Sequence, residues 1–159
     1  MKFFLIVTLL FSTITYAEEF SLICEGKRGF RIFNGKEINV IDFESVLLKI
    51  KNDSMEYIGI NSGRRYIFRN KEYTAPKKPP HEDIEIKELY AITPQKIKAS
   101  QTITDAGNSK ESSITLIHLN IDLLTGKFKE LESVINKNTS KKSVRSDFRG
   151  SCKKEDRSY

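Results

Sequence analysis

The chain of 159 residues contains no tryptophan, and it has only two histidines and two cysteines. No Cys-x-x-Cys pair occurs, and neither histidine is close to a cysteine in the sequence, so the spacings of zinc sites and redox dithiols are absent. The chain also lacks a G-x-S-x-G elbow and a glycine-rich loop before a helix. These absences predict a protein that is not an enzyme and that uses no metal or other cofactor.

The first residues have the layout of a secretory signal peptide. Lys2 precedes the apolar run FFLIVTLLF, and Thr15 and Ala17 place small residues before a cleavage site after Ala17. The run is shorter than the roughly 20 apolar residues of a membrane-spanning helix. A buried N-terminal strand or helix is the alternative. We expect a signal peptide over 1–17 and one exported domain over 18–159, periplasmic or extracellular, with no transmembrane anchor.

The two cysteines stand at opposite ends of that domain. Cys24 lies in FSLICEG and Cys152 lies in FRGSCKK. Disulfides persist in oxidising compartments, so two cysteines in an exported chain predict one bridge. Two free, buried thiols are the alternative.

Positive charge is concentrated at the C-terminus. Residues 18–136 carry equal numbers of basic and acidic side chains, whereas residues 137–159 carry eight basic and three acidic ones. Such a segment attracts anionic surfaces, although solvated tails carry similar runs. The candidates for binding an anionic envelope polymer or lipid headgroups are Lys141, Lys142, Arg145, Arg149, Lys153 and Lys154. If residues 144–152 form a strand, Arg145 and Arg149 share one face, and Phe148 and Cys152 share the other.

Runs rich in Val, Ile, Tyr and Phe alternate with turn signals through the middle of the chain, which predicts strands. Asn34-Gly35 is a hairpin signal between two such runs. The apolar alternation slips in phase near Glu44, which predicts a bulge or a turn. Further along, Ile117, Leu119 and Ile121 share one face of a long strand.

A proline-rich stretch, APKKPPHED, interrupts this pattern and predicts a loop over residues 71–82. Residues 84–92 follow it and predict a strand, with a short helix as the alternative. His81 falls in the loop and is expected to be exposed. His118 is expected on the solvent side of its strand or packed against it.

Eight or nine strands at short, even spacing predict an all-β fold, either a sandwich or a barrel. If Cys24 on the first strand bonds Cys152 on the last, those strands are neighbours, as closure of an up-and-down barrel requires. We therefore predict an antiparallel meander of about eight strands in a closed or strongly curled barrel, with a disulfide joining the first and last strands.

Three short motifs, LICEG, IDLLTGK and FRGSC, resemble a loose group of small exported bacterial proteins. Members of that group share a Cys-x-Gly start, an Ile-Asp or Ile-Asn…Thr-Gly hairpin and a Gly-x-Cys end. The resemblance covers both ends of the mature chain and implies export and the bridge. The group has no assigned activity, so it implies nothing about mechanism.

The stretch NSGRRY is similar to the Ser-Gly-x-x-Tyr motif of periplasmic inhibitors of animal-type lysozyme. In that family the serine helps to plug the lysozyme cleft, together with a lysine from a following Trp-x-Lys-Gly segment. Ser62 is the matching serine. This chain has no tryptophan and no matching Lys-Gly, and its positive charge suits a cationic lysozyme poorly. A Ser-Gly pair before a strand is also an ordinary turn.

Two functions remain. One is a small β-barrel that binds an apolar or envelope-derived ligand or a protein partner, which requires a concave apolar pocket. The other is a structural protein of the cell envelope, which requires a filled interior and a contiguous basic patch. The stretch RRYIFRNKEY mixes cations and aromatics as a nucleic-acid-binding strand does, but export argues against a nucleic-acid partner.

The signal peptide gives a direct test. N-terminal sequencing of the protein recovered after export should begin at Glu18, because the small residues at 15 and 17 place the cut there. A sequence that begins at Met1 would contradict the prediction.

Overall fold

The computed structural model describes residues 19–31, 37–75, 84–105 and 112–155. The predicted signal peptide, Asn34-Gly35 and His81 lie outside the described residues. Among the described residues, no helix is long and apolar enough to cross a membrane. The described strands are β1 (Phe20–Arg31), β2 (Glu37–Ile50), β3 (Ser54–Gly59), β4 (Arg65–Arg69), β5 (Lys71–Ala75), β6 (Ile84–Ile92), β7 (Lys96–Asp105), β8 (Ser113–Asp122), β9 (Lys127–Asn136) and β10 (Lys142–Lys154).

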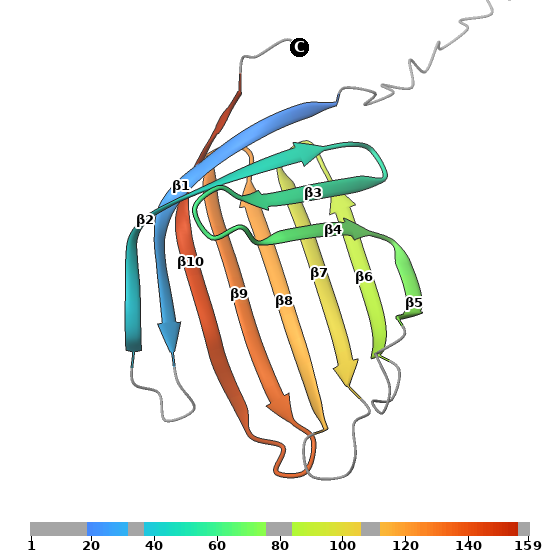
Figure 1. Cartoon of the computed structure of the whole chain (residues 1–159). Coiled ribbons are helices and arrows are strands. Elements are labelled where there is room, and N and C mark those ends of the chain that lie inside the picture. Colours follow the sequence, from blue (N-terminus) through green and yellow to red (C-terminus); the bar gives the residue numbers. More distant parts are fainter. Residues whose placement is uncertain (1–18, 32–36, 76–83, 106–111, 156–159) are drawn as a thin grey trace, which may run out of the picture.

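These strands form one sheet in the order β4-β3-β2-β1-β10-β9-β8-β7-β6-β5, and every pair of neighbours is antiparallel. The sheet curls until β3 and β4 cross in front of the long strands β6–β9 (Figure 1), and β4 packs against β6 and β7. The all-β meander is therefore confirmed as a nearly closed barrel. The described residues contribute ten strands to it instead of about eight. One addition is β5, at Lys71–Ala75, where we expected a loop.

A disulfide between Cys24 and Cys152 joins β1 to β10 and confirms the predicted bridge. The two cysteines are direct cross-strand partners, and so are Gly26 and Gly150 two residues further along. A Cβ atom on Gly26 would lie 2.1 Å from the carbonyl oxygen of Arg149. The backbones therefore approach too closely at this point for any residue but glycine.

Beside this glycine pair, β1 and β2 bend (Figure 1). The register between them shifts from Gly26 opposite Glu44 to Arg28 opposite Ile41, so two residues of β2 oppose Lys27 alone. This is the bulge that the phase slip near Glu44 predicted. A bulge of this kind bends its strand and redirects the side chains around it.

The barrel interior is filled by side chains. Ile117, Leu119 and Ile121 point inward as predicted, and Phe148 is completely buried. The hydrophobic core consists of Leu22, Cys24, Val46, Leu48, Ile50, Met55, Tyr57, Phe68, Tyr90, Ile97, Ala99, Ile117, Leu119, Ile121, Phe128 and Phe148.

Hydrogen bonds of side chains cross the barrel near the edge strands β4 and β5, which do not pair with each other. The amide oxygen of Asn70 accepts a hydrogen bond from the backbone N–H of Tyr90 at 2.9 Å. The Tyr90 hydroxyl in turn donates to the carbonyl oxygen of Lys51 at 2.8 Å. Burial raises the pKa of Tyr90 to about 12. These contacts connect β6 to the β2–β3 turn without extending the sheet.

The disulfide should contribute strongly to stability, because it links residues that are 128 positions apart. In the chain-entropy description, a loop of this length is worth about 5 kcal/mol. We expect the Cys24→Ala/Cys152→Ala variant to unfold at a much lower urea concentration than the oxidised protein. Equal unfolding midpoints for the two proteins would contradict this expectation.

Candidate functional site

A completely buried arginine lies inside the barrel. Arg28 donates hydrogen bonds to both carboxylate oxygens of Glu130, each at 2.9 Å, and to the hydroxyl of Ser146 at 2.8 Å. It also donates to Glu44, and to the hydroxyl of Tyr57 at 2.6 Å. The Tyr57 hydroxyl donates to Glu130, also at 2.6 Å. Five strands are thereby connected through one guanidinium.

The electrostatics of this group favour its charged form. Burial alone would lower the pKa of Arg28, but the hydrogen bonds and charges of Glu130, Tyr57 and Glu44 raise it above its ordinary value. Burial, followed by the charge of Glu130, raises the pKa of Tyr57, which therefore stays neutral and can donate. The Arg28 guanidinium also lies 4.9 Å from the centre of the Phe148 ring.

Two further arginines balance the carboxylates of this cluster. Arg64 donates to Glu132 at 2.8 Å and lies 3.8 Å from Glu130. Arg145 lies 3.8 Å from Glu132. We call Arg28, Arg64, Arg145, Glu44, Glu130 and Glu132 the interior charge cluster. The three arginines and three carboxylates of this cluster balance, so we interpret it as a structural network. It occupies space in which a barrel could otherwise hold a ligand.

Ser62, the matching serine of the inhibitor motif, forms a hydrogen bond to a member of this cluster. The hydroxyl of Ser62 donates to Glu44 at 2.7 Å, and the side chain is partly buried. The neighbouring Gly63 has a φ of 66°, the left-handed conformation that favours glycine in a turn. The Ser-Gly pair therefore forms a turn whose hydroxyl is used within the fold.

The six cations predicted near the C-terminus do not form one patch. Lys141 and Lys142 lie at the start of β10, about 23 Å along the strand from Arg149. Arg145 pairs with Glu132 at a second bulge, and Lys154 lies 5.8 Å from the Phe20 ring at the rim of a pocket. Arg149 and Lys153 alternate with Phe148 and Cys152, so these two lie on the outer face, away from the core.

The outer face does carry a contiguous row of cations, drawn mostly from elsewhere in the chain. Arg149 on β10 is the direct partner of Lys27 on β1 and of Lys129 on β9. Lys129 is opposite Asn120, which is opposite Lys98 on β7. We call Lys98, Lys129, Arg149 and Lys27 the cationic row. Neighbouring strands are about 4.8 Å apart, so the row spans about 19 Å.

The charges around the row include both signs, so the row itself gives this face its positive excess. Asp147 accepts two hydrogen bonds from Arg149, at 2.8 and 3.2 Å, and these raise the pKa of Arg149. The Arg149 side chain is still 69% exposed. Neither Lys98 nor Lys129 forms an ion pair with another residue in the described part of the chain. Cations on this face include Lys96, Lys127 and Lys153 beyond the row, and its carboxylates include Glu25, Asp122 and Asp147.

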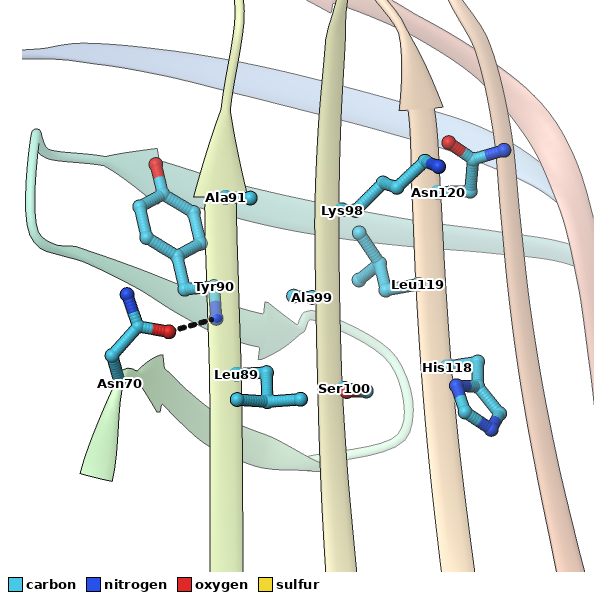
Figure 2. Close-up of a pocket in the computed structure, with 10 residues that line it drawn as sticks. All are labelled: Asn70, Leu89, Tyr90, Ala91, Lys98, Ala99, Ser100, His118, Leu119 and Asn120. Carbon is cyan, nitrogen blue, oxygen red and sulfur yellow. Dashed lines mark hydrogen bonds between the residues drawn. The ribbon is translucent and has the colours of Figure 1, made fainter. Parts of the chain in front are cut away.

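A shallow depression of about 510 Å³ adjoins one end of the row (Figure 2). Lys98 and Asn120 lie at one end of it, and Leu89, Ser100 and His118 lie along the strands below them. Leu89 is 51% exposed. Ser100 and His118 are direct cross-strand partners. A nucleophile and its base would be joined by a hydrogen bond, and the described residues show none between these two side chains. The depression therefore offers hydrogen-bonding groups beside a cation.

A second, smaller pocket of about 300 Å³ opens near the disulfide. Phe20, Leu22, Ile92 and Ile121 give it an apolar lining, and Lys154 stands at its rim. Its volume is at the lower limit of ordinary ligand sites. In the regions that the structure describes, no group of three or more His, Cys, Asp or Glu side chains is placed to hold a metal ion.

Sequence reasoning missed the cationic row because it counted charge along the chain, where residues 18–136 are neutral. The available signal was the local pattern. In KIK (96–98) and KFK (127–129), a buried apolar residue is flanked by lysines that must point outward together. Which such triplets lie side by side depends on strand order, and the sequence alone does not state it.

The interior charge cluster predicts a large effect of one substitution. Arg28→Met leaves Glu44 and Glu130 buried without their cation, and such a loss costs about 3–5 kcal/mol. Urea unfolding should show this destabilisation, and Arg28→Met/Glu44→Gln/Glu130→Gln should regain part of it. A destabilisation of the single variant below about 1 kcal/mol would contradict the assigned role of the cluster.

Comparison of the chain with models of protein families, with curated proteins and with solved structures finds no match.

Proposed function

We propose that this chain is an exported binding protein that attaches to polyanionic surfaces through the outer face of its sheet. The observation that carries the proposal is the cationic row, in which Lys27, Arg149 and Lys129 are direct partners on three adjacent strands. Like charges directly opposite one another destabilise a sheet. Asp147 accepts hydrogen bonds from Arg149 within the fold, and an anionic partner would offset the remaining repulsion between Arg149 and Lys129.

The row is also accessible. Lys27, Lys98, Lys129 and Arg149 are all exposed, whereas the carboxylates of the interior charge cluster are buried and paired. The row therefore faces solvent, and the carboxylates of the interior charge cluster are paired with the arginines of that cluster. Asn120 and the Figure 2 depression add hydrogen-bonding groups at one end of the row.

The contents of the barrel support surface recognition over the transport of an enclosed ligand. The core and the interior charge cluster occupy its centre, and the pocket near the disulfide is small. We do not propose lysozyme inhibition, because the Ser62 hydroxyl bonds to Glu44 within the fold. We also do not propose catalysis, because Ser100 and His118 share no hydrogen bond in the described chain. The disulfide is consistent with an oxidising, exported location.

Binding to dextran sulfate, a soluble polyanion, tests this function. The Lys98→Gln/Lys129→Gln variant should bind roughly thirtyfold more weakly than the wild type at low salt, at about 1 kcal/mol for each cation lost. Raising the salt concentration should weaken wild-type binding, because the Debye length falls from about 30 Å at 0.01 M to about 8 Å at physiological ionic strength. Isothermal titration calorimetry gives both comparisons.

The matched control is Lys141→Gln/Lys142→Gln, which removes the same charge at exposed positions distant from the row. It should bind almost as well as the wild type. An equal loss in the two variants would mean that net charge, and not the row, determines binding, and it would contradict the proposal.

A further inference from the structure

The exposed apolar side chains of the described region include two on neighbouring chain segments at the bulge of β2. Phe43 is 58% exposed and Ile60 is 57% exposed. The side-chain amide of Asn61 donates to the backbone oxygen of Phe43 at 3.2 Å, and the Ile60 N–H donates to the Ser45 carbonyl at 2.8 Å. These bonds hold the two chain segments together. We call Phe43 and Ile60 the apolar corner.

The bulge in β2 places this corner at the end of the cationic row. The two residues of β2 that oppose Lys27 are Asp42 and Phe43. On the next outward position of the same strand pair, Val40 is opposite Gly29 and is 45% exposed. The outer face thus carries four cations, and exposed Phe43 and Val40 lie on the strand next to Lys27.

We propose that the anionic surface recognised by this protein is a lipid bilayer, which the apolar corner enters while the cationic row contacts the headgroups. This inference rests on the proposed function and names its target. Cations beside exposed aromatic and aliphatic side chains form the pattern of proteins that lie at a membrane interface, with apolar groups about 5–10 Å deep. A soluble polyanion would use the cations and leave Phe43 and Ile60 in water.

The geometry suits a flat target. The row crosses five neighbouring strands of the sheet, and Phe43 lies in the bulge of β2. Strands β1 and β2 bend along their length (Figure 1). A bend presents its outer side chains at a convex corner. Such a corner can enter a soft surface, whereas a concave protein cleft would be needed to receive it in a folded partner.

Sedimentation with vesicles tests the inference, using the oxidised protein recovered after export. The vesicles are phosphatidylcholine with 30% phosphatidylglycerol, or phosphatidylcholine alone. The wild type should bind the anionic vesicles, and the Phe43→Ser/Ile60→Ser variant should bind them at least about tenfold more weakly. Both proteins should bind dextran sulfate equally, because the corner variant retains the row.

A matched control removes apolar surface elsewhere. Leu124 on the β8–β9 turn is 75% exposed and Ile67 on β4 is 39% exposed, and both lie outside the corner. The Leu124→Ser/Ile67→Ser variant should bind vesicles as the wild type does. An equal loss in this control would overturn the assignment to the corner.

The possible outcomes separate the two proposals. Wild-type binding to dextran sulfate without binding to vesicles, or full vesicle binding by the corner variant, would overturn the bilayer inference and leave the proposed function standing. An absence of binding to both probes would overturn both. Sedimentation velocity covers a further rival: a wild-type dimer that Phe43→Ser/Ile60→Ser converts to a monomer would assign the corner to self-association and overturn the inference.

Discussion

The register between β1 and β10 is the constraint on which the rest of the barrel depends. Cys24 is the partner of Cys152 and, two residues along, Gly26 is the partner of Gly150. A Cys-x-Gly segment on one strand is therefore paired with a Gly-x-Cys segment on its antiparallel neighbour. The disulfide fixes which residues are partners, and the glycines let the backbones approach where the strands bend. Every charge of the outer row from β1 to β9 is aligned by this pair, because Lys27 and Arg149 are the next partners along it.

The interior charge cluster complements this covalent constraint. A two-residue slip of one strand would still keep its apolar side chains on the inner face, but a guanidinium that donates to Glu130, Glu44, Ser146 and Tyr57 has few alternative arrangements. A strand displaced by one residue would bury a charge without its partner, at a cost of several kcal/mol. The cluster therefore helps to specify a single fold, even if apolar residues in the same space would give similar stability.

The general architecture could be predicted from the sequence because the signals were local. Alternation placed Ile117, Leu119, Ile121 and Phe148 inside, the phase slip located the bulge, and two cysteines in a chain expected to be exported predicted the bridge. Strand β5 was missed because the loop predicted from the prolines was extended back over Lys71–Ala75, which precede them.

The candidate site was much harder to predict. Arg28 and Glu44 appear in the sequence as ordinary strand-surface charges, and only the folded barrel places them next to Glu130, which is 102 residues away from Arg28. The cationic row likewise joins Lys27, Lys98 and Lys129 to Arg149 through strand order. Charge counted along the chain located the excess at the C-terminus, but charge counted across the sheet locates it on one face.

The seam at which the sheet fails to close has a consequence for solubility. An unpaired strand edge is a template for pairing with another copy of the same protein, which leads to aggregation. Here the two edges are short, five residues each, and they carry exposed Arg65 and Arg69 on β4 and exposed Lys71 and Glu72 on β5. Short, charged edges resist such pairing, so this barrel can remain unsealed without becoming the start of a fibril.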